Sequence, residues 1–134
     1  RADWRLMADA EAVRRALESG AAQVVDVRAA ARFRGEQPEP RPVARLGHMP
    51  GALNAPFGDL QQGQFNEMAS PEAIRAHFAA AGVDLSRPVM TSCGSGVTAC
   101  YSALALHLIG HESVAVYDGS WAEWGDLEDV PVVR

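Results

Sequence analysis

Short continuous apolar runs alternate along the chain with longer stretches in which apolar residues recur every three or four positions. The runs predict buried strands, and the periodic stretches predict helices that bury one face. The predicted strands cover residues 23–27, 52–56, 89–91 and 114–117. The predicted helices cover residues 7–19, 71–81, 97–109 and 121–124, with a short helical turn at 29–33 and an extended tail at 130–134.

Punctuating residues set several of these boundaries. Ser70 before Pro71 is a typical helix start, because the serine caps the first turn and proline is favoured at the first helical position. Gly20 and Gly82 are expected to end the two helices before them. Residues 35–51 hold four prolines and predict a long, stiff loop.

Strands that are apolar along their length and alternate with helices are typical of a parallel sheet covered on both faces. The pattern therefore predicts an α/β fold. In such sheets a functional site lies outside the carboxyl ends of the strands. The chain, residues 1–134, is short enough to form a single domain.

Composition narrows the class of protein. Hydrophobic residues make up 48% of the chain, as in an ordinary globular domain. A formal net charge of -5, without any Lys/Arg cluster, argues against binding to nucleic acid or to an anionic membrane surface. No apolar stretch approaches the roughly 18 residues of a membrane span, and the polar residues 1–4 do not resemble a signal peptide.

The two cysteines, Cys93 and Cys100, are typical of a protein from a reducing compartment, and we expect a cytoplasmic location. A disulfide between them is not expected, because the mostly helical backbone in between holds their Cα atoms roughly 10 Å apart. Their spacing matches no zinc-binding pattern.

The segment with the most chemical information is CGSGVT, residues 93–98, which joins a predicted strand to a predicted helix. Gly94 and Gly96 let the backbone curl with few Cβ clashes. Curled amides and the positive end of the helix together favour an anion, so a cysteine held there is available as the thiolate. We predict that Cys93 is a nucleophile; the alternative is a buried structural cysteine in a tight turn.

This segment resembles the active-site loop of rhodanese-type sulfurtransferases, specifically of the type that uses 3-mercaptopyruvate. Further segments resemble signatures of that family in the same order: VDVR at 25–28, RFRG through PEPR at 32–41, GHMPGA at 47–52 and YDGSW at 117–121. The resemblance implies a rhodanese-like three-layer α/β/α sandwich with a mostly parallel central sheet of about five strands. It also implies that the chain, which begins without Met, is the C-terminal domain of a longer protein whose N-terminal rhodanese domain completes the catalytic cleft.

The resemblance also implies a set of site residues. They are Cys93 and Ser95 as catalytic residues, and Arg32, Arg41, Gly94, Gly96, Val97 and Thr98 as substrate-binding residues. Judged without the resemblance, Ser95 is equally a turn serine, Thr98 is better explained as a helix cap, and both arginines are solvated loop charges. No metal and no organic cofactor are expected.

The other polar and aromatic residues are interpreted as structural. Asp26 and Asp118 stand at strand ends, where a carboxylate can fix a loop by accepting backbone N–H bonds. The remaining interpretations are that Arg28 and Arg34 are structural or solvated, that His48 is structural, that Cys100 belongs to the core, and that Trp121 and Trp124 pack, with one of them able to line a pocket wall.

The charge of the loop favours one sulfur donor. A thiosulfate dianion is best bound by a loop with cationic side chains, and the side chains of this loop are neutral. A neutral loop with two arginines nearby is better suited to bind a 2-oxo acid. We predict that Cys93 takes sulfur from 3-mercaptopyruvate as a persulfide and passes it to cyanide or to a small or protein thiol. A thiosulfate:cyanide sulfurtransferase is the alternative.

Two competing classes are a phosphatase and a binding module. Cysteine phosphatases that resemble this fold close a Cys-x5-Arg loop with an arginine, but Ala99 stands at that position, so phosphoryl transfer is not predicted. A non-catalytic binding module would tolerate loss of the cysteine, and the intact Cys93 loop speaks against it.

Overall fold

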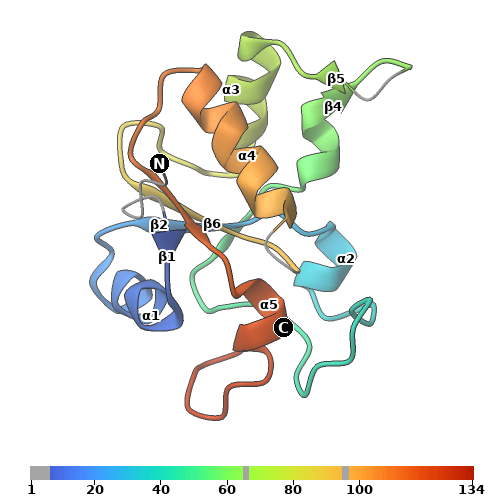
Figure 1. Cartoon of the computed structure of the whole chain (residues 1–134), viewed down its shortest axis with the longest axis vertical. Coiled ribbons are helices and arrows are strands. Elements are labelled where there is room, and N and C mark those ends of the chain that lie inside the picture. Colours follow the sequence, from blue (N-terminus) through green and yellow to red (C-terminus); the bar gives the residue numbers. More distant parts are fainter. Residues whose placement is uncertain (1–6, 65–66, 95–96) are drawn as a thin grey trace.

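The centre of the molecule is a five-stranded sheet, seen in a computed structural model that describes residues 7–64, 67–94 and 97–134. The strand order is β1-β7-β6-β2-β3, and each neighbouring pair is parallel (Figure 1). The strands are β1 (Met7–Ala8), β2 (Gln23–Asp26), β3 (Leu53–Asn54), β6 (Val89–Ser92) and β7 (Val114–Tyr117). The prediction of an α/β fold with a mostly parallel sheet is confirmed.

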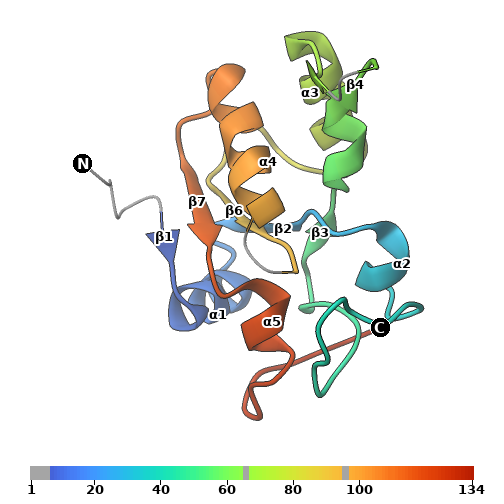
Figure 2. The ribbon, with the colours of Figure 1, turned by 45° about the vertical axis from the view of Figure 1, so that its right-hand side comes forward.

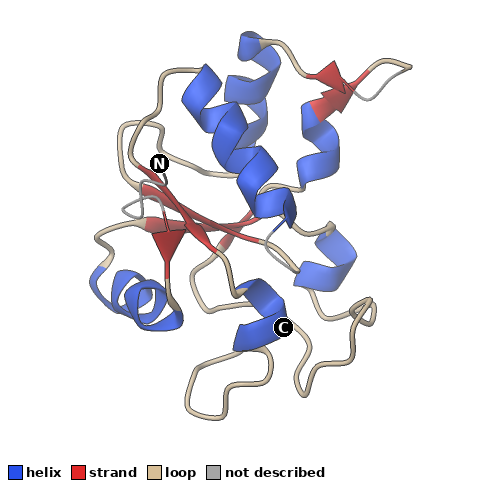
Figure 3. Cartoon of the chain, in the orientation of Figure 1, coloured by secondary structure: helices blue, strands red, loops and turns tan. Residues whose placement is uncertain are grey.

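Helices cover both faces of the sheet (Figure 3). One hydrophobic cluster joins α3 (Pro71–Ala80) and α4 (Val97–Leu108) to the sheet, and a second joins α1 (Ala10–Ser19) and α5 (Ser120–Trp124). In β2, Val25 belongs to the first cluster and Val24 to the second, because successive strand residues point to opposite faces. The fold is therefore a three-layer α/β/α sandwich, and none of its described helices is long and apolar enough to cross a membrane.

The predicted helix 7–19 begins too early. Asp9 is the N-cap of α1 and accepts the N–H of Ala12 at 2.8 Å, and residues 7–8 before it form β1 beside β7. An edge strand of two residues is too short to show an alternating pattern in the sequence. Residues 7–8 were therefore assigned to the helix that follows them. Gly20 ends the helix as predicted, in the left-handed conformation with φ 74°.

The other long elements follow the prediction closely. β2, β6 and β7 coincide with three predicted strands, and α3 begins at Pro71 with Ser70 as its N-cap. α2 (Ala30–Phe33) is the predicted helical turn, while the predicted strand 52–56 is reduced to the two residues of β3. The short 3-10 helix η2 (Phe57–Leu60) and the antiparallel pair β4 (Gln61–Gln62) and β5 (Glu67–Met68) were not predicted.

The proline-bearing loop 35–51 lies beside the C-terminal segment of the chain (Figure 2). The Arg45 guanidinium donates to the carbonyl of Val130 at 2.9 Å. Gly47 lies so close to the carbonyl of Val133 that a Cβ would collide with it, which explains why a glycine stands there. These contacts hold the loop against the C-terminal segment of the chain.

Candidate active site

The cysteine loop starts at the carboxyl end of β6, the middle strand of the sheet, as predicted. The N–H of Cys93 donates to Ser120 Oγ at 3.0 Å, and the carbonyl of Cys93 accepts the N–H of Trp121 at 2.8 Å. The carbonyl of Gly94 accepts the N–H of Ala122 at 2.9 Å. The first turn of α5 therefore holds the first two residues of the loop.

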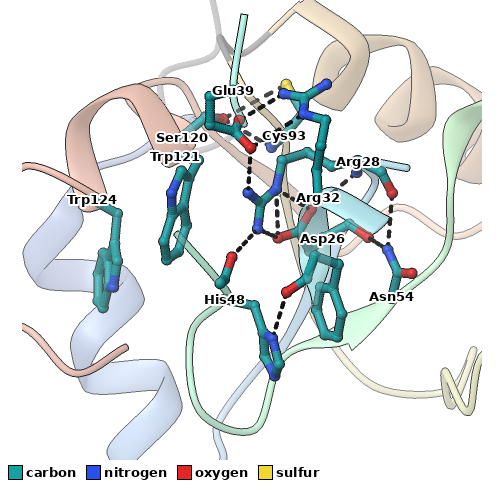
Figure 4. Close-up of polar contacts among 12 residues, drawn as sticks. Asp26, Arg28, Arg32, Glu39, His48, Asn54, Cys93, Ser120, Trp121 and Trp124 are labelled. Atoms are coloured by element: carbon teal, nitrogen blue, oxygen red, sulfur yellow. Dashed lines mark hydrogen bonds and ion pairs between the residues drawn. The ribbon is translucent and has the colours of Figure 1, made fainter. Parts of the chain in front are cut away.

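The side chain of Cys93 is buried, with 1% of its surface exposed. Ser120 Oγ lies 3.7 Å from its sulfur, and Figure 4 shows the sulfur beside the guanidinium of Arg32. The hydrogen bond to Glu39 is the main cause of the raised pKa of Arg32, and the electrostatic influence of Cys93 is the smallest of the causes. The sequence interpretation relied on main-chain donors alone, and the structure adds a side-chain cation close to the sulfur.

Ser120 is a residue of this site that the sequence analysis missed. Its φ of 50° lies in the left-handed region, which is uncommon for a residue with a Cβ. The hydroxyl that accepts the N–H of Cys93 also donates to the carbonyl of Tyr117 at 2.8 Å. The hydroxyl thus ties the end of β7 to the cysteine loop at the start of α5.

Replacing Ser120 by alanine or by glycine is expected to lower the free energy of unfolding by about 1–3 kcal/mol, because the buried N–H of Cys93 then loses its hydrogen bond to Ser120 Oγ. Alanine keeps the strain of the positive φ and glycine relieves it, so a loss in both variants, smaller in the glycine variant, identifies the hydroxyl as the cause. Urea unfolding monitored by tryptophan fluorescence measures the change. Unchanged stability in both variants would contradict this role.

A cavity of about 440 Å³ opens beside the cysteine loop. Its charged lining residues are Arg28, Arg32, Glu39 and Arg41, and the loop contributes Gly94 and Thr98. The structure thus brings both predicted substrate-binding arginines to one cavity with the cysteine loop. Of the described loop residues, Gly94 lines the cavity and Cys93 itself does not.

Arg32 on α2 makes a two-point contact with Glu39. Its Nη2 donates to Oε1 at 2.7 Å, and its Nε donates to Oε2 at 3.2 Å. This hydrogen bonding is the main reason that the pKa of Arg32 is raised, with burial acting against it and the charges of Glu39, Asp26 and Cys93 adding to it. Arg32 is therefore a cation at any physiological pH.

Arg41 is exposed and lines the same cavity. Its guanidinium forms no hydrogen bond and no ion pair with the part of the chain that the structure describes. Pro40 and Pro42 flank it and restrict its backbone. Arg41 is thus an uncompensated positive charge at the cavity, which is what an anionic substrate requires.

Arg28 is buried and structural, in agreement with the sequence interpretation. Its guanidinium donates to Asp26 Oδ2 at 2.7 Å, to Glu39 Oε2 at 3.1 Å and to the carbonyl of Gly47 at 2.6 Å. It also lies over the ring of Trp121, 4.5 Å from the centroid. Asp26 accepts the backbone N–H of Arg28 at 3.0 Å, so its predicted role in fixing a loop is confirmed.

The remaining loop residues have different positions. Ser95 and Gly96 lie outside the described residues. Val97 is the first residue of α4, and its side chain is 73% exposed. Thr98 is the second residue of α4, so it is not the helix cap that the residues alone suggested, and it lines the cavity instead.

Several residues outside the cavity are structural, as predicted. His48 Nδ1 lies 2.7 Å from the carbonyl of Phe33, and the two rings stack with centroids 3.7 Å apart. Trp121 and Trp124 are fully buried, and neither belongs to the lining of the cavity. Arg34 is a surface residue that pairs with an exposed glutamate.

Cys100 is exposed, which corrects the expectation that it belongs to the core. It lies on the outer side of α4, and the two cysteines form no disulfide. Partial burial raises the pKa of Cys100, and the negative charges of Asp118 and Cys93 raise it further. Cys100 is therefore mainly a neutral thiol at pH 7 and a weak nucleophile.

A cysteine at the carboxyl end of a central parallel strand, with a cationic cavity beside its loop, is the arrangement expected of a rhodanese-like domain. The family model of the rhodanese-like domain matches residues 9–127, and the chain belongs to this family.

Named relatives agree with this assignment. The chain is 51% identical over 114 residues to the human 3-mercaptopyruvate sulfurtransferase, a match that covers 85% of this chain and 38% of the human protein. It is 49% identical over 110 residues to the thiosulfate sulfurtransferase of Bos taurus, covering 81% of this chain and 36% of the bovine protein. The crystal structure of SseA from Escherichia coli matches with a TM-score of 0.74 and 38% identity, over 87% of this chain and 42% of SseA. The chain spans less than half the length of these proteins.

Proposed function

We propose that this domain takes sulfur from 3-mercaptopyruvate, holds it as a persulfide on Cys93 and passes it to cyanide or to a small or protein thiol. The observation that carries the proposal is that Arg32 and Arg41 line one cavity with the cysteine loop. A 2-oxo acid presents a carboxylate and an adjacent carbonyl in one plane, which two guanidiniums can hold at once. The relatives named as 3-mercaptopyruvate sulfurtransferases support the choice of donor.

The first step is attack by the Cys93 thiolate on the sulfur of the donor. A sulfur–sulfur bond forms and the carbon–sulfur bond of the donor breaks, so its electron pair passes to the pyruvate enolate. The enolate takes up the proton that the donor thiol gave up and leaves as pyruvate. An acceptor thiolate or cyanide then attacks the outer sulfur and regenerates the Cys93 thiolate.

The charges formed in these steps need stabilisation. The loop amides at Gly94, Gly96, Val97 and Thr98 are proposed to hold the thiolate and the persulfide anion. The cation Arg32, which is coupled electrostatically to Cys93, is proposed to add to their effect. Ser95 is proposed to donate its hydroxyl to the donor carbonyl, where the enolate oxygen develops charge.

A second rhodanese domain is proposed to complete the cleft. The matched relatives are more than twice as long as this chain, and the matched segment lies in their C-terminal half. Polar groups from an N-terminal domain would then face the cavity from its open side. Two cysteines without a disulfide also suit a reducing compartment, so we propose that the protein acts in the cytoplasm.

Thiocyanate formation with each sulfur donor tests the proposal. The expected result is that 3-mercaptopyruvate gives a higher kcat/KM than thiosulfate, because the cavity offers two guanidiniums to a carboxylate while the loop is neutral. Turnover by this chain alone is expected to be slow, since the proposed second domain is missing from it. Thiosulfate as the better donor would favour the alternative activity, which the bovine relative supports.

Replacing Arg41 by alanine is expected to raise the KM for 3-mercaptopyruvate by about tenfold to a hundredfold, because a charge-assisted contact to the carboxylate is lost. The value of kcat should change less, since the contact exists before and during the reaction. Arg34→Ala is the matched control, because Arg34 is also a surface arginine of this region but does not line the cavity. Equal effects of the two substitutions on KM would contradict the role of Arg41.

A further inference from the structure

Glu39 is a buried carboxylate that contacts two arginines at once (Figure 4). Its side chain is 4% exposed. One oxygen accepts Arg32 Nη2 at 2.7 Å, and the other accepts Arg32 Nε at 3.2 Å and Arg28 Nη1 at 3.1 Å. Glu39 therefore joins the arginine of the cavity to the buried arginine behind it.

The buried end of this chain of contacts is fixed to the sheet. Arg28 is bound to Asp26, the last residue of β2, through both carboxylate oxygens. The carbonyl of Gly47 and the ring of Trp121 hold the same guanidinium from other sides. A carboxylate bonded to such an anchored cation has little freedom to move. Through Glu39 and Arg28, the side chain of Arg32 is therefore fixed relative to β2.

The contact with Glu39 also decides which edge of Arg32 faces a ligand. A guanidinium has five N–H donors in one plane. Glu39 takes the edge formed by Nε and Nη2, and no other described residue bonds to Arg32 through its side chain. The edge formed by Nη1 is thus available to a ligand.

The same contact places Arg32 against the cysteine loop. A Cβ built on Gly94 would collide with Arg32 Nη2, and Glu39 Oε1 would lie 3.5 Å from it. The guanidinium therefore packs directly over the backbone of the residue after Cys93. A small rotation of Arg32 would change both its distance to the sulfur and the direction of its free edge.

We propose that Glu39 is a positioning residue, which fixes the plane and the place of Arg32 so that the carboxylate of a 2-oxo acid meets an already oriented guanidinium. This inference rests on the proposed function. A free arginine side chain loses rotamer freedom when it binds a ligand, and Glu39 has removed that freedom beforehand. Glu39 does so even though its negative charge by itself repels the same ligand.

The charge of Glu39 and its positioning of Arg32 have opposite effects on pyruvate binding, so the direction of the change in Glu39→Gln tells them apart. Pyruvate is the probe, and its binding is read as protection of Cys93 against alkylation by iodoacetamide, followed on the Cys93 peptide by mass spectrometry. Removing a negative charge alone would make Glu39→Gln bind pyruvate more tightly. Loss of positioning predicts the reverse, namely a half-protecting pyruvate concentration that is about tenfold higher.

The control is the same substitution in a chain that lacks Arg32. In an Arg32→Ala background, Glu39→Gln is expected no longer to weaken protection, because the residue through which Glu39 acts is absent and only the loss of its negative charge remains. The rate of Cys93 alkylation without pyruvate is measured for each variant, and protection is expressed relative to that variant's own rate. Glu39→Asp, which keeps the charge but shortens the reach, serves if the glutamine variant does not fold, and it should also weaken protection.

The outcomes separate this inference from the proposed function. If pyruvate protects wild type and the Glu39 variants equally, or the glutamine variant better, Glu39 does not position Arg32 and the proposed function is unaffected. If Glu39→Gln still weakens protection in the Arg32→Ala background, Glu39 has a general structural role and the inference is overturned. If pyruvate does not protect Cys93 in wild type at all, the proposed 2-oxo acid site itself is wrong.

Discussion

Replacing Cys93 by serine is expected to lower thiocyanate formation on the order of a thousandfold or more with either donor, because a serine hydroxyl is not ionised at neutral pH and cannot carry a persulfide. The substitution exchanges one atom, sulfur for oxygen, at a buried position, so the fold should remain intact. Steady-state cyanolysis with 3-mercaptopyruvate and with thiosulfate measures the change.

The matched control is Cys100→Ser. Cys100 is exposed on α4, and its raised pKa keeps it a neutral thiol, so its loss should leave turnover unchanged. If Cys93→Ser retained full turnover, or if Cys100→Ser abolished it, sulfur transfer through Cys93 would be refuted.

Replacing Arg28 by methionine is expected to lower the free energy of unfolding by about 3–5 kcal/mol, because two buried carboxylates then lose their shared cation. Asp26 and Glu39 are 3% and 4% exposed, so water cannot take the place of the guanidinium. Methionine has a similar length and fills most of the volume, which separates the loss of charge from the loss of packing. Urea unfolding in the wild type and the variant measures the difference.

Arg34→Met is the comparison for Arg28. Arg34 pairs with Glu36 at 2.9 Å, but both side chains are more than half exposed, so solvent replaces the pair when it is broken. Its unfolding curve should overlay that of the wild type. A loss of stability in Arg28→Met no larger than that in Arg34→Met would show that the buried network contributes little.

The predicted elements that agree with the structure are those determined by residues within or next to them in the sequence. β7 was predicted with its exact bounds because Val114 and Val116 make its apolar run continuous, and its neighbours on both sides end it. The start of α3 was predicted because Ser70 and Pro71 act on the residues next to them. β1 has no such local cause, since two residues at a sheet edge are held there by pairing with β7.

The site residues divide in the same way. Cys93 is predicted as a nucleophile because the glycines that follow it in the sequence let the backbone of the loop curl. Ser120 stands 27 residues away from Cys93 and meets it only because α5 packs under the loop. Glu39 lies within residues 32–41, a segment that resembles one of the family signatures, but its contacts with two arginines exist only when the loop is folded over β2.

The burial of the sulfur also could not be predicted from the sequence. The small residues after Cys93 indicate that the backbone of the loop curls. They do not indicate which helices or loops cover the side chain of Cys93. Ser120 from α5 and Arg32 from α2 both lie close to Cys93, and these elements are distant from it in the chain. Packing of the layers, rather than the loop itself, decides how far the sulfur lies from solvent.

Mass spectrometry of the protein after brief treatment with 3-mercaptopyruvate tests the persulfide most directly. The expected result is a gain of one sulfur atom, located on the peptide that contains Cys93 and removed again by cyanide. A protein that gains no sulfur, or that gains it only on Cys100, would contradict sulfur transfer through Cys93.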